Sequence, residues 1–346
     1  EQESWVQHEA ISGFSPNAFT NDKNYSERYY TSMLANTSEP SNRKGGIQFQ
    51  NQIEKEQTDR DIELNNLIRF FTKHPDWFLR NRFNARLRDI EEERDEFSLS
   101  TLEKHQLFRQ IFSWRLSGIE PDQIRPVVLE SGILPAGWGG RKNFNELSES
   151  VDASLRALKE LDVKPELSYL DVNIRLKDSR LSGLVENYSN RELVQINPSS
   201  KRGGNLFKAW LNHLAVQASG QFESTVSRFI CDLKKGEPKV ITFSQIKDPI
   251  ELLVELMEEY RGQSGKPLLF FPDVIQQYFD KDYLTKPDYA RSEAKKKFEG
   301  DQHTFAERDN LSVKLLYGPN VEFSEEMLDK TYLKWMENMN NHMTEE

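Results

Sequence analysis

The stretch from residue 167 to residue 201 constrains the fold more than any other part of the chain, because apolar and polar residues alternate there in three short runs. The first run places aliphatic side chains from Leu170 to Leu176 on one face of a strand, and the later runs centre on Val185 and Val194. A period of two, with polar turns at this spacing, predicts a three-stranded antiparallel meander. Helical periodicity lies on both sides and one more strand pattern follows, so we expect the order α-β-β-β-α-β.

Around this core the sequence predicts two regions of different character. Residues 1–60 are rich in Asn, Ser, Gln and Glu, with irregularly spaced aromatic residues, so we expect an extended N-terminal arm there. A disordered leader is the alternative interpretation of the same composition. Residues 61–346 form one expected domain: a helical part at 61–162, the α-β-β-β-α-β core at 144–243 and a C-terminal helical part at 247–343.

Local signals mark several helix boundaries. Pro75 disfavours helical geometry in the residue before it, so we expect a helical segment that starts after residue 61 to break near His74. Ser100 and Glu103 have the spacing of a capping box, in which each side chain bonds the backbone of the other residue. A helix that begins near residue 203 should end at Gly220, because glycine tolerates the left-handed conformation of a helix end.

Composition excludes several classes of protein. The net charge of -10 argues against a uniformly basic nucleic-acid binder, so any contact with DNA requires a local basic surface. Cys231 is the single cysteine, which excludes an intrachain disulfide and fits a reducing cytoplasm. The sequence lacks the paired cysteines of a structural zinc site, an apolar run of membrane-spanning length and a Walker phosphate loop. We therefore expect this chain to bind no zinc, no membrane and no ATP.

Arginine residues mixed with aromatic residues on either side of Pro75 suit a nucleic-acid backbone and its bases. Basic residues also follow the meander, and a lysine run occupies residues 295–297. For each of these residues a solvated helix face is the alternative interpretation. The DNA-binding candidates are Arg69, Arg80, Arg82, Arg86, Arg88, Lys201 and Arg202.

The meander is also where a metal-dependent nuclease would hold Mg²⁺, with two carboxylates on adjacent strands and a lysine beside the second. The layout resembles that of the RecB-type nucleases, whose active members carry GxxD on one strand and Asp-Tyr-Lys on the next. The corresponding positions here hold Glu186, Asn197 and Ser199. An amide at the second position removes negative charge that would help to bind the ion. The resemblance implies an α/β fold with a restriction-endonuclease-like (PD-(D/E)XK) core, a mixed central sheet flanked by helices, no catalytic residues and no bound metal.

Two other functions stay open at this point. A rearranged nuclease site would use Glu186, Asp171 and Lys201, since Asp171 lies on the first predicted strand and Lys201 follows the third. A pure protein-interaction module is the other alternative, because aromatic residues of the arm can serve docking. Mg²⁺-dependent cleavage of DNA would favour the rearranged site, whereas salt-sensitive binding of forked DNA would count against the interaction module.

Six motifs follow one another along nearly the whole chain. They are Phe14-Ser-Pro16 with Phe19, the segment 67–80, Leu102–Leu107, Trp210–Ala215, Tyr260-Arg261 with Pro267–Leu269, and Ala290–Phe298. Each motif is weak alone, but together and in this order they resemble the C-terminal part of the RecC family, the gamma subunit of exodeoxyribonuclease V. The absent initiator Met then indicates a fragment of a longer subunit.

The resemblance implies that the chain binds the RecB and RecD subunits and contacts double-stranded DNA ends and the separated single strands. It also implies a non-catalytic part in double-strand-break repair by homologous recombination. In that role the chain guides the DNA strands and helps to separate them, docks partner subunits and takes part in recognition of the Chi signal. The motors and the nuclease, with their ATP and Mg²⁺, then belong to the partner subunits.

Overall fold

The structure is a computed structural model that describes residues 61–345, with gaps at 86, 88–98, 177, 234–236, 264–266 and 302–305. All of the described residues belong to one compact unit, Ile47–Glu346. The predicted arm at 1–60 and the candidates Arg86 and Arg88 lie outside the described residues, so they stay predictions. No helix in the described part of the chain has both the length and the apolar character that a bilayer crossing needs.

The first sheet is built around a hairpin that the sequence predicted. It has the strand order β1-β3-β2 and consists of β1 (Asp61–Glu63), β2 (Ser168–Leu176) and β3 (Ser179–Asn187). β2 and β3 pair antiparallel, and β1 adds to β3 in parallel. Val172, Ile174 and Leu176 are buried while the residues between them are exposed, which confirms the predicted alternation along this strand. The register places Tyr169 opposite Glu186, so both side chains leave the same face of the sheet.

The third run of the predicted meander does not join this sheet, so the prediction of a three-stranded meander is wrong at its last strand. β4 (Leu193–Ile196) pairs in parallel with β5 (Ser227–Cys231), and β6 (Lys239–Phe243) and β7 (Met343–Glu345) complete a second sheet of order β4-β5-β6-β7. Hydrogen bonds still connect β4 to the end of β3. The side-chain oxygen of Asn187 accepts from the Val194 N–H at 2.8 Å and from the Ser189 N–H at 3.3 Å, and the Tyr188 N–H donates to the Val194 carbonyl at 3.0 Å. Alternation shows which face of a strand is buried but not which strand lies beside it.

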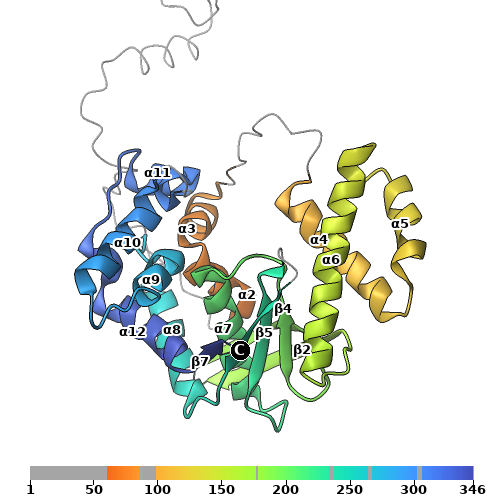
Figure 1. The fold of residues 1–346 in the computed structure, drawn as a ribbon. Coiled ribbons are helices and arrows are strands. Elements are labelled where there is room, and N and C mark those ends of the chain that lie inside the picture. Colours follow the sequence, from red (N-terminus) through yellow and green to blue (C-terminus); the bar gives the residue numbers. More distant parts are fainter. Residues whose placement is uncertain are drawn as a thin grey trace, which may run out of the picture. The chain divides into compact units, whose positions relative to one another are not determined.

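One hydrophobic core joins the first sheet to α7 and to the C-terminal helices (Figure 1). Its helices are α2 (Leu64–Thr72), α3 (His74–Phe83), α7 (Gly203–Ser219), α8 (Pro249–Gln263), α9 (Pro272–Phe279), α10 (Pro287–Glu299), α11 (Leu311–Tyr317) and α12 (Lys330–Asn341). The helix break predicted near His74 is confirmed, because α2 ends at Thr72 and α3 begins at His74. The predicted end of α7 at Gly220 is confirmed by its left-handed φ of 65°.

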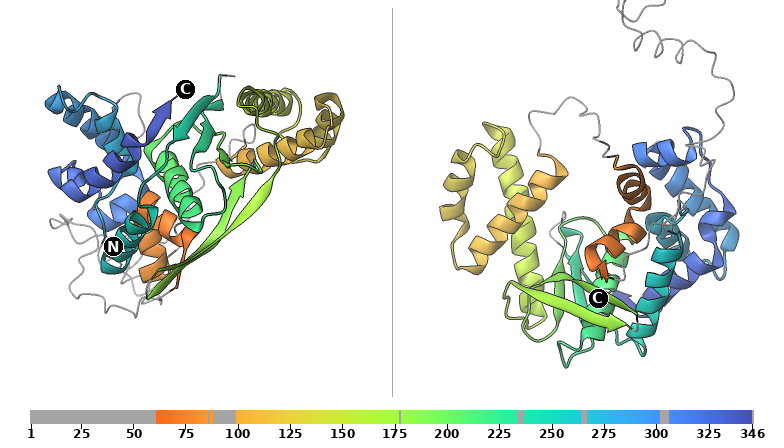
Figure 2. Two further views of the ribbon diagram at one scale, coloured as in Figure 1. Left: turned by 90° about the horizontal axis from the view of Figure 1, so that it is seen from below. Right: turned by 180° about the vertical axis from the view of Figure 1, so that it is seen from behind.

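A second core lies on the other face of the second sheet, beneath α4 (Thr101–Leu116), α5 (Pro121–Glu130) and α6 (Trp138–Glu160). Successive residues of β5 point to opposite cores, since Phe229 and Cys231 belong to the first and Ile230 belongs to the second. Figure 2 shows the α4–α6 helices and the α8–α12 helices on different sides of the strands. The β4-α7-β5 unit is therefore covered on both faces, as parallel strands usually are.

The predicted capping box at the start of α4 is confirmed. The Ser100 backbone N–H donates to the Glu103 carboxylate at 2.8 Å, and the Glu103 N–H donates to the Ser100 hydroxyl at 3.2 Å. Such a reciprocal pair satisfies two backbone donors that the first helical turn leaves without partners. α4 also contributes His105 and Arg109, from its second and third turns, to the lining of a cavity.

Candidate functional site

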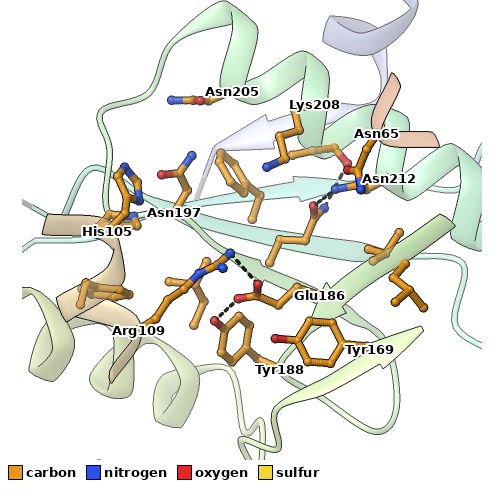
Figure 3. A pocket seen from close by; sticks show the side chains of 18 residues that line it. Asn65, His105, Arg109, Tyr169, Glu186, Tyr188, Asn197, Asn205, Lys208 and Asn212 are labelled. Atoms are coloured by element: carbon orange, nitrogen blue, oxygen red, sulfur yellow. Dashed lines mark hydrogen bonds and ion pairs between the residues drawn. The ribbon is translucent and has the colours of Figure 1, made fainter. Parts of the chain in front are cut away.

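A cavity of about 370 Å³, here called the central cavity, opens where the two sheets meet α4 and α7 (Figure 3). Its walls come from α2, α4 and α7, from β2, β3, β4 and β5, and from the loops after β3 and β4. Apolar side chains such as Phe108, Leu184 and Phe229 alternate around it with polar groups. The polar lining residues are Asn65, His105, Arg109, Tyr169, Glu186, Tyr188, Gln195, Asn197, Asn205, Lys208 and Asn212.

Glu186, near the end of β3, is the only carboxylate among the described residues that line the central cavity. Its Oε2 lies 2.6 Å from Nη2 of Arg109, and its Oε1 accepts a hydrogen bond from the hydroxyl of Tyr188. Burial raises the pKa of Tyr188, and the negative charge of Glu186 adds to this effect, so the phenol stays protonated and can donate. The negative charge of Glu186 is therefore balanced by a guanidinium and held by a phenol (Figure 3).

Two cations, Arg109 and Lys208, line the central cavity together with this neutralised carboxylate. Lys208 of α7 keeps contact with solvent, but the surrounding protein lowers the pKa of its ammonium, and the charge of Arg109 lowers it further. The positive charges of Lys73 and Arg69 also lower the pKa of Lys208, whereas the negative charge of Glu186 raises it. We call Arg69, Lys73, Arg109 and Lys208 the basic cluster.

The same charges affect the protonation of His105 at the cavity. Burial lowers the pKa of His105, and Arg109 and Lys208 lower it further. His105 is thus neutral at pH 7, and its Nε2 lies 3.0 Å from the hydroxyl of Ser199. Each cation in this region raises the electrostatic cost of protonating its neighbours, and a bound anion would relieve that cost.

The structure brings the nuclease-equivalent positions near one another. Glu186 and Asn197 both line the central cavity, and Ser199 contacts it through its hydrogen bond to His105. The Asn197 side-chain oxygen accepts from the backbone N–H of Ser199 at 3.0 Å. The donor set is thus one carboxylate already paired with Arg109, one neutral amide and one hydroxyl. It does not fit a divalent cation, which is usually held by charged oxygen ligands that are not already neutralised.

The rearranged nuclease site is not assembled in the structure. Asp171 faces the same side of the first sheet as Glu186 but does not line the central cavity. Lys201 instead donates to the carboxylate of Glu345 at 2.8 Å, on the last strand of the second sheet. Across the described part of the chain, no three His, Cys, Asp or Glu side chains come together in the manner of metal ligands.

The other predicted DNA-binding residues are divided between different places. Arg69 belongs to the basic cluster, whereas Lys201 and Arg202 line a second cavity of about 270 Å³ beside α9 and α10. Arg80 is exposed and Arg82 is half-buried on α3. The lysine run is an ion-paired helix face, because Lys295, Lys296 and Lys297 lie near Glu299, Glu293 and Glu307 respectively.

Sequence reasoning missed Lys73, Arg109 and Lys208, which the fold brings toward Arg69. His105 and Arg109 lie four residues apart on α4 and so share a helix face, which is a signal that the sequence does contain. No pattern in the sequence predicts that this face of α4 lies near Lys208 of α7. The two helices belong to different hydrophobic cores, and the packing of those cores against the sheets sets their relative position.

The fold and the site define an α/β protein with two mixed sheets and a basic, amide-lined cavity between them. The sequence profile of the RecC C-terminal domain matches residues 59–283, which is more than half of the chain, and the chain belongs to that family. RecC is a subunit of exodeoxyribonuclease V, the RecBCD holoenzyme of DNA repair and recombination. A search of curated proteins gave no match. The resemblance drawn from the sequence is thereby confirmed, and the restriction-endonuclease-like core stays a prediction.

Proposed function

We propose that this domain guides DNA strands within a RecBCD-type helicase–nuclease and carries out no catalysis itself. The observation that supports the proposal is the basic cluster around a carboxylate that Arg109 already neutralises. The chain as a whole has a net charge of -10, so a local group of cations determines where a polyanion can approach. Phosphate contacts of this kind hold a strand without reading its sequence.

Electrostatics at the cavity argues against a nuclease. A nuclease of this layout needs negative charge at two positions to hold Mg²⁺ and to stabilise the attacking and leaving oxygens. In this chain Glu186 is paired with Arg109, and Asn197 contributes no charge. Arg109 and Lys208, which line the cavity with Glu186, would repel a metal ion and attract a phosphate.

Membership of the RecC family supports the finer parts of the proposal. In this proposal the chain docks RecB and RecD in the cytoplasm, helps to separate the strands of a broken duplex end and takes part in the response to Chi. The ATP-driven motors and the Mg²⁺-dependent nuclease are on the partner subunits. No step of DNA cleavage then depends on a residue of this chain.

Binding of forked DNA by the purified chain tests the proposal. In EDTA we expect binding that weakens steeply with salt, and we expect Arg69→Ala to weaken it about fivefold near 0.1 M salt, the effect of losing one phosphate contact. Arg125→Ala is the matched control, because Arg125 is an exposed arginine of α5 that lines neither cavity. Salt-independent binding, or cleavage of the DNA when Mg²⁺ replaces EDTA, would contradict the proposal.

A protein-interaction module is a second candidate, because large apolar side chains are exposed around the junction of α5 and α6. Trp138 is 74% exposed, Val127 is 55% exposed and Ile133 is 46% exposed. Exposed apolar groups of this size often mark a docking surface. If this were the only function, Trp138→Ser would reduce binding of a RecB-type partner subunit, and the chain would show no affinity for DNA.

A further inference from the structure

We infer that the central cavity receives one unstacked base of a DNA single strand, while the basic cluster holds the phosphates on either side of it. The inference rests on the proposed function, because it assumes that a strand passes over this face. A cavity of about 370 Å³ lies within the range of roughly 300–1,000 Å³ that is typical of small-molecule sites. A base with part of its sugar is a ligand of that class.

The mouth of the cavity offers an aromatic surface for stacking. Tyr169 is 60% exposed although it lines the cavity, and its neighbour across the strands is Glu186 rather than an apolar group. Leu184, on the same face of the first sheet, is 59% exposed. An exposed ring beside an exposed aliphatic side chain is costly in water and is suited to the face of a base.

Inside the cavity, some amides are already occupied by the protein. The Asn212 amide donates to Gln195 at 2.7 Å, and the Gln195 amide donates to the backbone oxygen of Ala209 at 3.0 Å. The Asn205 amide likewise donates to the backbone oxygen of Ser200 at 3.2 Å. These three side chains serve mainly to build the wall of the cavity.

Two further amides have hydrogen-bonding capacity to spare. Within the described part of the chain, the NH₂ group of Asn197 has no hydrogen-bond partner, and neither has the side chain of Asn65. Amide side chains offer a donor beside an acceptor, which matches the polar edges of bases. Figure 3 shows both amides together with Arg109 and Lys208 around the cavity.

The mixed character of the lining favours a base over a bare phosphate. A phosphate alone would find Glu186 close to the guanidinium that should bind it, and it would have no apolar face to place against the exposed side chains of Leu184 and Tyr169. A base presents apolar faces and polar edges without charge, so it satisfies both kinds of wall. Arg69 and Lys73 do not line the cavity, so these two cations can attract the charged phosphates that stay outside it.

A comparison of two oligonucleotides of equal length tests this inference with the full chain. One carries a base at every position, and the other is an abasic strand with the same number of phosphates. Stacking of one base on an aromatic ring predicts about five- to hundredfold tighter binding of the strand that carries bases. Tyr169→Leu should remove most of this difference, and Asn65→Ala should reduce it.

Matched controls come from residues outside the cavity. Tyr289→Leu replaces another exposed tyrosine, 50% exposed on α10, and Asn145→Ala replaces an exposed asparagine on α6. Both should retain the preference for bases. If Tyr289→Leu removed the preference as fully as Tyr169→Leu does, the inference would be overturned.

The outcomes also separate this inference from the proposed function. Equal affinity for the two strands, with binding that still falls with salt, would overturn the base pocket and leave strand guiding intact. If neither strand bound in a salt-dependent way, the proposed function would fail and the inference would fail with it. Tighter binding of the strand with bases, lost in Tyr169→Leu and kept in both controls, would support it.

Discussion

Replacing Glu186 by glutamine is the most direct perturbation of the central cavity, because it removes the negative charge and nearly preserves the shape of the side chain. In the native chain Arg109 lies 2.6 Å from the Glu186 carboxylate. The glutamine oxygen can still accept from Tyr188, while the guanidinium of Arg109 becomes available to a phosphate. We therefore predict that Glu186→Gln strengthens DNA binding, whereas the same change in a working nuclease would abolish cleavage.

The size of the effect follows from the charges around the cavity. The basic cluster holds four cations and one of them, Arg109, is paired with the carboxylate of Glu186, so about three positive charges remain for phosphates. Each phosphate contact with a single strand contributes about −0.7 to the slope of log K against log salt concentration. The expected slope is thus about −2 for the native chain and about −2.8 for Glu186→Gln. If the two affinities are equal near 1 M salt, they differ about fivefold near 0.1 M.

Fluorescence anisotropy of a labelled single strand, titrated with salt in EDTA, measures both slopes. Glu255→Gln is the control, because Glu255 also pairs with a cation, Lys334 at 2.8 Å, and the change adds the same net charge. Glu255 and Lys334 lie on α8 and α12 and do not line the central cavity. An unchanged slope for Glu186→Gln, or an equal gain in both variants, would refute the argument that charge at the cavity controls binding.

Two further predictions concern the stability of α7, which forms one wall of the cavity. Burial lowers the pKa of His213 from 6.5 to about 4, so the neutral imidazole contributes fully to the free energy of unfolding above pH 6.5, and this contribution is lost as the pH falls toward 4. Urea unfolding should therefore show a loss of about 3 kcal/mol in the free energy of unfolding across that range. A His213→Asn variant that kept the whole of this pH dependence would show that another group causes it. Gly203→Ala should lower the free energy of unfolding by about 1–3 kcal/mol, seen as a lower Tm in a thermal melt. The reason is that the new Cβ would lie 2.1 Å from the backbone oxygen of Pro272 at the start of α9. Gly262→Ala is the control, since nothing lies within 4 Å of its Cβ position, and an equal loss in both would show that the contact is not the cause.

The sequence correctly predicted the features that depend on residues close together along the chain. The alternation in β2, the break at Lys73, the capping box of Ser100 and the glycine end of α7 each depend on residues within a few positions of one another. The partner of β4 was predicted wrongly, because the same alternation suits a strand in either sheet. The hydrogen bond from the Val194 N–H to the Asn187 side-chain oxygen depends on the conformation of the intervening loop, which the alternation of apolar and polar residues does not predict.

The sequence by itself predicted the α/β core, and it holds one acid, one amide and one hydroxyl at the positions where the resemblance to RecB-type nucleases predicts a metal site. It also contained the ordered motifs of the RecC family. Only the tertiary structure decided that Glu186 meets Arg109, and that Arg69, Lys73 and Arg109 lie close enough to Lys208 to lower its pKa. The physical reason is that the charge environment of a side chain depends on distances through space. Here those distances are set by helices from two separate cores that pack against opposite faces of one sheet.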